Sequence, residues 1–170
     1  MTQLPDVEKL LEKMEAGLRN ILERRGVTDP VIVGIRTGGV WLAEQLNQRL
    51  GLSGPLGELD ISFYRDDFSR IGLNPRVKPS RLPFGTEGRD IVLIDDVLMS
   101  GRTIRAAMNE LFDYGRPASI ILATLVDIGA RELPVQPDAI GQMMSLPPNQ
   151  RVKLRGPDPL YIELRETGDL

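Results

Sequence analysis

Apolar and polar residues follow two different periods along the chain. Residues 7–25 place their apolar side chains on one face of a helix; these are Val7, Leu10, Leu11, Met14, Leu18, Ile21 and Leu22. Asp6 is placed to cap this helix and Gly26 to end it. The run at 31–35 is too short for a helix and rich in β-branched residues, so it predicts a buried strand. A helix over 40–50 is expected after the turn at 36–39.

The second half of the chain repeats this alternation. A strand is predicted over 59–64, and an apolar run at 91–94 leads into Asp95 and Asp96. From Thr103 an amphipathic helix is expected, with its apolar face formed by Ile104, Ala107, Met108, Leu111 and Phe112. Another buried strand is predicted over 120–126. Beyond Asp127 prolines divide the chain, and 152–154 and 160–164 are predicted as short edge strands.

Strands that alternate with helices predict an α/β fold. We expect a mainly parallel, twisted sheet flanked by helices, in one domain that spans residues 1–170. Residues 65–89 are rich in glycine and proline, and a loop of this length is usually functional or disordered. Because ligands of parallel sheets bind at the carboxyl ends of the strands, one rim is expected to carry residues 36–39, the loop from 65, residues 95–103 and the loop at Asp127.

Residues 91–103 combine features that suit a phosphorylated sugar. Asp95 and Asp96 point to opposite sides of an extended strand, and their carboxylates can accept hydrogen bonds from ribose hydroxyls. Gly101 permits a close backbone approach, and the new helix offers N–H groups to a phosphate. Ser100 and Thr103 add hydroxyl donors. The alternative is that the two acids only cap the next helix, as aspartate often does.

Composition excludes several kinds of chemistry. The chain has no cysteine and no histidine, which rules out disulfides, thiol nucleophiles, zinc fingers and Ser-His-Asp hydrolysis. Any metal would be a hard cation held by carboxylates and substrate oxygens, which favours magnesium. The net charge of -3 does not indicate a nucleic-acid binder. No run is long enough to span a bilayer and the N-terminus mixes acids with bases, so a cytoplasmic location is expected.

The chain resembles the PyrR family, pyrimidine operon attenuators that are also uracil phosphoribosyltransferases of the type I superfamily. Residues 91–103 match the phosphoribosyl-pyrophosphate (PRPP) motif, and 57–67, 113–118, 125–127 and 131–134 match further family segments. The resemblance covers about residues 5–165. It implies a type I phosphoribosyltransferase fold with a flexible catalytic loop at about 65–89 and a small C-terminal hood at about 127–165. It also implies conversion of uracil and PRPP to UMP and diphosphate with Mg²⁺, and a homo-oligomer.

The same resemblance assigns roles to individual residues. Asp95 and Asp96 would hold the ribose hydroxyls and help to place Mg²⁺ indirectly, through substrate and water. Uracil would contact Met99, Ile140 and Gly141, although Met99 is nearly as well explained as a core residue. PRPP would also contact the loop residues Val97, Leu98, Met99, Ser100, Gly101, Arg102 and Thr103, and the pyrophosphate loop would consist of Arg36, Thr37, Gly38 and Gly39.

Arg65 is the third residue that the resemblance places in catalysis. At the base of the long loop its guanidinium would swing in to bind pyrophosphate through two parallel hydrogen bonds. The alternative is a surface ion pair with Asp66 or Asp67. The residue type alone fits both roles equally well.

The sequence departs from the family at three places. Gly38 stands where many members carry a cation, which would weaken pyrophosphate binding, and Met143 stands where an amide is usual. The first helix and residues 128–130 lack the cations and histidines that attenuators use for RNA. The first two changes favour an alternative function, a nucleotide-sensing regulator with weak catalysis, whereas the third removes the dominant contribution to RNA affinity. A third possibility is transfer to another base such as hypoxanthine or orotate. Arg151, Lys153 and Arg155 form either a small basic strip or a solvated edge.

Overall fold

The computed structural model describes residues 3–61 and 80–167, and a five-stranded parallel sheet forms its centre. The strand order is β2-β1-β3-β4-β5. The strands are β1 (Val31–Ile35), β2 (Gly57–Leu59), β3 (Asp90–Leu98), β4 (Ser119–Asp127) and β5 (Ala139–Met143). All four neighbouring pairs are parallel, as the alternation of strands and helices predicted.

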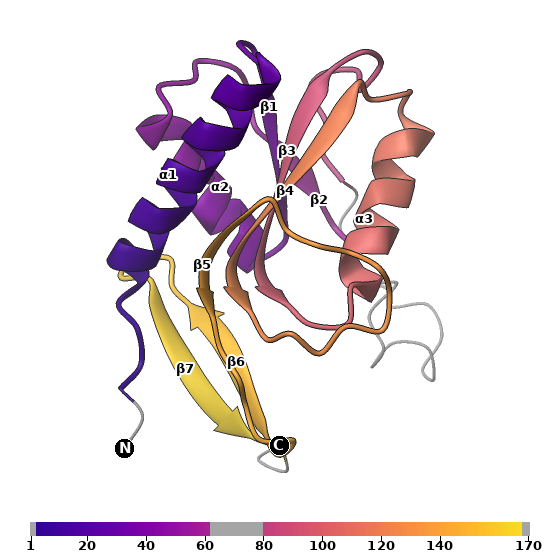
Figure 1. Cartoon of the computed structure of the whole chain (residues 1–170). Coiled ribbons are helices and arrows are strands. Elements are labelled where there is room, and N and C mark those ends of the chain that lie inside the picture. The colour runs from indigo at the N-terminus through magenta and orange to yellow at the C-terminus, as the bar shows by residue number, and fades with distance from the viewer. Residues whose placement is uncertain (1–2, 62–79, 168–170) are drawn as a thin grey trace.

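Helices cover both faces of the sheet. Helices α1 (Val7–Arg25) and α2 (Gly38–Arg49) lie on one face, and α3 (Arg102–Asp113) lies on the other (Figure 1). The residues of α1 predicted to be apolar and inward are all buried. The predicted caps are confirmed, because the Asp6 side chain accepts a hydrogen bond from the Glu8 N–H at 3.2 Å and Gly26 adopts a φ of 66°. None of the described helices is long and apolar enough to cross a membrane.

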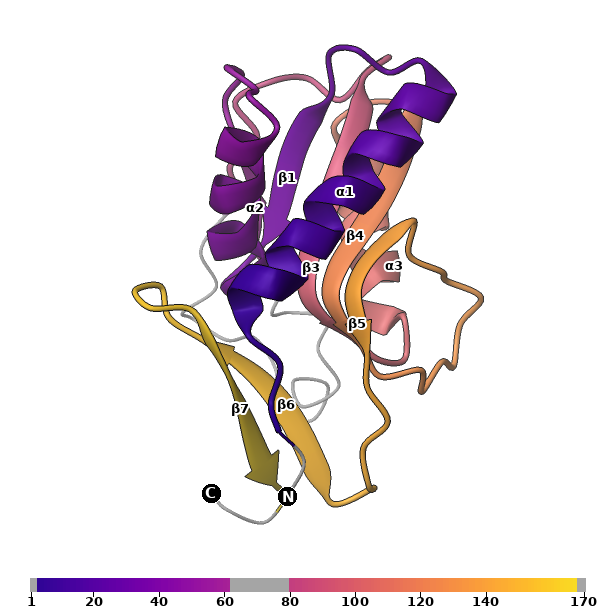
Figure 2. The same cartoon turned by 60° about the vertical axis from the view of Figure 1, so that its left-hand side comes forward.

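A hairpin of β6 (Gln150–Arg155) and β7 (Tyr161–Glu166) forms a separate antiparallel sheet. It lies beside the carboxyl ends of the central strands (Figures 1 and 2). Leu154 and Ile162 face the body of the protein and join its core. The predicted segments 152–154 and 160–164 are therefore strands, but they pair with each other and do not form edges of the main sheet. Their position agrees with the expected C-terminal hood.

Strand β5 was not predicted. Its sequence contains Gly141, which gives no strand-forming side chain, so the alternation of apolar residues is too short to recognise. The structure explains the glycine: a Cβ atom there would lie 2.4 Å from the Leu125 carbonyl oxygen and 2.9 Å from the Leu10 Cβ. Helix α1 therefore packs so closely on β5 that only glycine fits.

Other predicted boundaries also moved. Strand β3 continues through the acidic pair to Leu98, because residues 90–98 pair with β4 along almost their whole length. Strand β2 starts at Gly57 and ends at Leu59, before most of the predicted 59–64, and residues 62–79 lie outside the described residues. Helix α2 begins at Gly38, two residues earlier than expected. Phe112, predicted on the buried face of α3, is exposed.

Candidate functional site

The acidic pair lies at the carboxyl end of β3, and its two side chains point to opposite faces as predicted. Asp95 is buried next to the α3 face, where its cross-strand neighbour is Thr124. Asp96 is half-buried and reaches the start of α2. Each carboxylate accepts a hydrogen bond from the next backbone N–H, at 2.9 Å for Asp95 and 2.8 Å for Asp96. Neither side chain caps a helix, so the capping alternative is excluded for α3, whose N-cap is Gly101.

Two glycines bring the start of α2 against this pair. A Cβ atom on Gly38 would lie 2.5 Å from Oδ2 of Asp96, and one on Gly39 would lie 2.5 Å from the Ile94 carbonyl oxygen. Real Cβ atoms do not approach other atoms this closely. The glycines therefore allow the pyrophosphate loop at 36–39 to contact β3 directly, and Gly38 in particular makes room for the Asp96 carboxylate.

Arg36 does not extend from the loop as an isolated cation. Its guanidinium donates to the Glu58 carboxylate from Nε at 3.1 Å and from Nη2 at 2.8 Å. Asp60 lies 4.0 Å away, and the Arg36–Thr37 peptide bond is cis. A carboxylate on β2 therefore already compensates the charge of Arg36 in this structure, and its contact with pyrophosphate stays a prediction.

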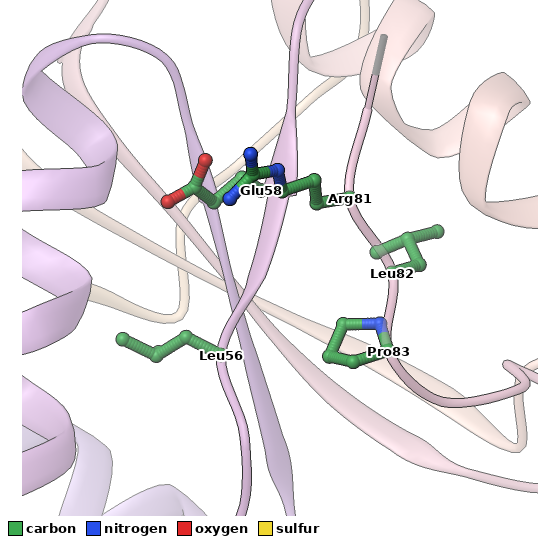
Figure 3. A pocket seen from close by; sticks show the side chains of 5 residues that line it. All are labelled: Leu56, Glu58, Arg81, Leu82 and Pro83. Carbon is green, nitrogen blue, oxygen red and sulfur yellow. The ribbon is translucent and has the colours of Figure 1, made fainter.

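Glu58 also lines a cavity on the outer edge of β2. The cavity has a volume of about 460 Å³ and is bounded by Leu56, Glu58, Arg81, Leu82 and Pro83. Figure 3 shows Leu56 and Glu58 on one segment and the other three on the segment beside it. The two segments are joined by paired backbone hydrogen bonds of 2.7 Å between Glu58 and Arg81. None of its lining residues belongs to the predicted site.

The turn between β3 and α3 has the shape of an anion cradle. Gly101 adopts a φ of 91°, which side-chain-bearing residues rarely adopt. The Ser100 hydroxyl accepts from the Arg102 N–H at 3.2 Å. The first turn of α3 leaves further N–H groups without an intrahelical acceptor, and the helix dipole adds positive potential there. The turn thus offers backbone N–H groups to an anion, and its role as a phosphate loop stays a prediction.

A segment of the hood packs behind this cradle. The carbonyl oxygen of Ser100 accepts from the Glu132 N–H at 2.9 Å and the Leu133 N–H at 3.0 Å. Arg131 donates to the Met99 carbonyl oxygen at 3.0 Å and to both oxygens of buried Asp127, at 2.8 and 2.6 Å. The hydrogen bond from Arg131 lowers the pKa of the Asp127 carboxyl below its usual 3.8, against the opposing effect of burial. Both residues fall in segments that match the family, but their pairing was not predicted, because Asp127 ends a strand and Arg131 follows it outside any helix.

Two of the residues expected to contact the base, Ile140 and Gly141, lie on β5, and the third, Met99, follows β3. Across the carboxyl rim, Leu98 of β3 is level with Asp127 of β4, which is level with Met143 of β5. Ile140 is half-buried and Gly141 is buried within β5. Met99 is 40% exposed, so its alternative explanation as a core residue is wrong. Arg65, Asp66 and Asp67 lie outside the described residues.

The donor set suits a metal held only indirectly. Among residues 3–61 and 80–167 no group of three acidic side chains could hold a cation. Asp95 and Asp96 provide two carboxylates at the rim. This agrees with a magnesium ion that takes most of its ligands from substrate and water, as Mg²⁺ often does.

Known proteins share both the sequence and the architecture. The phosphoribosyl transferase domain family matches residues 1–145. The bifunctional protein PyrR of Pseudomonas syringae pv. tomato (strain ATCC BAA-871 / DC3000) is 57% identical over 96% of each chain. That of Pseudomonas putida (strain W619) is 59% identical over 96% of this chain and 95% of its own. A hypoxanthine-guanine phosphoribosyltransferase structure from Bacillus anthracis matches 85% of this chain and 84% of its own with a TM-score of 0.68. At 18% identity this last likeness concerns the fold alone.

Proposed function

Because the chain belongs to the PyrR family and has the type I phosphoribosyltransferase fold, we propose that it transfers the phosphoribosyl group of PRPP to uracil. The products would be UMP and diphosphate. We further propose that the enzyme works in the cytoplasm and forms a homo-oligomer. Sedimentation of the purified protein would test the oligomeric state.

One arrangement carries this proposal. The buried strand β3 presents two carboxylates at the rim and continues directly into a turn that can bind an anion. A ribose 5-phosphate likewise carries a diol and a phosphate in one small molecule. The pair therefore suits the ribose hydroxyls, and the backbone from Val97 to Thr103 suits the 5-phosphate.

The reaction needs no nucleophile from the protein. Uracil displaces diphosphate at the anomeric carbon, and positive charge develops on the ribose ring as the bond to diphosphate breaks. Asp95 and Asp96 would stabilise that charge through the adjacent hydroxyls and orient the ring. The N–H groups of residues 36–39 would face the departing diphosphate. Ile140, Gly141 and Met99 would border uracil, with the backbone of β5 reading its edge.

Magnesium is the cofactor that we propose. Asp95 and Asp96 would hold it through the ribose hydroxyls and water, and when bound it would neutralise charge on the diphosphate. This assignment is supported by the pair of rim carboxylates and by the absence of histidine and cysteine.

Incubation with labelled uracil, PRPP and Mg²⁺ tests the proposal. We expect UMP to accumulate, and hypoxanthine and orotate not to compete with uracil. The protein carrying both Asp95→Asn and Asp96→Asn serves as the control, because it keeps the size of both side chains. If the unaltered protein forms no UMP between neutral and alkaline pH, the proposed activity is wrong.

A second candidate function is regulation through RNA. The relatives are named bifunctional, and the outer face of the β6–β7 hairpin offers a surface for a polyanion. Arg151 and Arg165 are opposite each other in the ladder, and Lys153 is opposite Glu163. Glu163 pairs with Arg165 at 3.0 Å, so Arg151 and Lys153 are the cations of this face that we propose would contact the polyanion.

A filter-binding titration with pyrimidine operon leader RNA tests this second function. Binding should strengthen with UMP and weaken steeply as salt rises, since neutralised phosphates dominate such affinity. Reversing the charge with Arg151→Glu should abolish it, whereas Glu163→Gln should not. Undetectable or salt-insensitive binding would leave transfer as the only activity proposed.

A further inference from the structure

Arg131 joins three parts of the rim. Its guanidinium makes two hydrogen bonds to Asp127 at the end of β4. A third, of 3.0 Å, goes to the Met99 carbonyl oxygen in the phosphate loop, and a fourth, of 2.7 Å, goes to the Val135 carbonyl oxygen in the hood. The side chains are largely shielded, with 17% of Arg131 and 4% of Asp127 exposed.

These contacts determine which way the loop's carbonyl groups point. The Met99 oxygen accepts from Arg131, and the Ser100 oxygen accepts from the Glu132 and Leu133 N–H groups. Both oxygens are therefore held toward the hood. A carbonyl oxygen turned into the cradle would repel a phosphate, so fixing these two leaves the N–H groups to face the anion.

We propose that Asp127 and Arg131 are positioning residues that hold the phosphate loop in its anion-binding shape. Neither would touch the substrate. Asp127 orients the guanidinium, and Arg131 fixes the Met99 carbonyl oxygen and ties the loop to the hood. This proposal rests on the proposed function, because it gives the loop the task of binding the 5-phosphate of PRPP.

The geometry requires arginine at this position. A planar guanidinium can serve a carboxylate and two carbonyl groups at once, whereas a lysine ammonium cannot match that fork. Removing only one partner of a buried ion pair leaves a charge without compensation and destabilises the fold. The informative variant therefore changes both residues, Asp127→Asn together with Arg131→Met, which leaves no buried charge at either position.

Steady-state kinetics separate positioning from general damage. In the double variant the KM for PRPP should rise at least about tenfold, because a displaced anchor weakens phosphate binding. Inhibition by diphosphate should change less than about twofold, because residues 36–39 bind it at a different loop. Arg131→Lys should lie between the double variant and the unaltered protein. Glu15→Gln is the matched control: it removes a surface ion pair with Arg19 on α1 and alters no residue of either loop, so KM should not change.

Amide hydrogen exchange gives a readout that does not need activity. Exchange at residues 99–103 should accelerate at least about tenfold in the double variant and stay unchanged in Glu15→Gln, as expected when a local constraint is lost. If the unaltered protein forms no UMP while exchange accelerates as expected, the proposed function fails and the positioning role stands. If UMP forms but both KM for PRPP and exchange match those of the unaltered protein, the positioning role is refuted.

Discussion

Adding a side chain at position 38 should lower the activity of the enzyme with little effect on its stability. In Gly38→Ala the new Cβ atom would lie 2.5 Å from Oδ2, 3.0 Å from Cγ and 3.1 Å from Cβ of Asp96. An ordinary van der Waals contact begins near 3.4 Å. The carboxylate must therefore move by roughly 1 Å, and displacements of that size cost about 10²-fold in rate. We expect kcat/KM for PRPP to fall by about that factor, equivalent to ~2.7 kcal/mol of transition-state stabilisation.

Stability should change far less than activity in this variant. Asp96 is only half-buried, so its side chain can shift into solvent. Alanine also favours a helix over glycine by about 1 kcal/mol, which offsets part of the crowding in the first turn of α2. The melting temperature should therefore remain close to that of the unaltered protein.

Two further glycines provide the comparison for this experiment. Gly39→Ala would place a Cβ atom 2.5 Å from the Ile94 carbonyl oxygen in a buried strand, so it should lower stability and activity together. Gly54→Ala meets no atom within 4 Å and should change neither. UMP formation and thermal melting of the three variants test this pattern. Full activity in Gly38→Ala would refute a role for the position of the Asp96 carboxylate.

Three other outcomes are expected. Asp95→Asn and Asp96→Asn should each lower kcat/KM by more than about tenfold, and unchanged kinetics in both would exclude them from the reaction. Thr124→Val should raise the unfolding free energy by about 1 kcal/mol, because the buried Thr124 hydroxyl has no hydrogen-bond partner in the described part of the chain; denaturant titration measures this, and a loss of stability would contradict it. The depressed pKa of Asp127 implies that its pairing with Arg131 contributes stability above the ordinary value of 3.8, which is lost as pH falls through the lower folded-state value. The stability difference between unaltered protein and Arg131→Met should therefore narrow as pH falls below about 4, while the part due to the hydrogen bonds to Met99 and Val135 remains; constancy down to about pH 2 would show that the two charges do not interact.

Local patterns predicted the elements whose packing is simple. Helix α1 has one apolar face and clear caps at Asp6 and Gly26, so its bounds followed directly from spacing. The buried strands β1, β3 and β4 were recognised because both of their faces pack against helices, so each contains an unbroken run of at least three apolar residues. Strand β5 was not predicted. Its Gly141 is required by the close packing of α1, and a tertiary constraint of this kind produces no periodic pattern in the sequence.

The site also contains features that the sequence predicted and contacts that it did not. The acidic pair and the Gly101 turn are contiguous in sequence, so one segment was enough to predict them. The contacts of Arg36 with Glu58 and of Arg131 with Met99 join residues far apart in the chain. No pattern within either segment reveals such pairs, since a charged residue in a loop is usually solvated. Only the fold shows that both guanidinium groups are already engaged.

The structure gives a steric reason for glycine at position 38, where many family members carry a cation. A side chain there would occupy the space that the Asp96 carboxylate uses, so a cation at 38 and this placement of Asp96 exclude each other. The remaining arginine of the loop, Arg36, is compensated by Glu58. Residues 36–39 therefore offer diphosphate the dipoles of their N–H groups and little net charge. Charge neutralisation must come from outside these four residues, while glycine at 38 brings a carboxylate of the ribose site within contact of the loop that receives the leaving group.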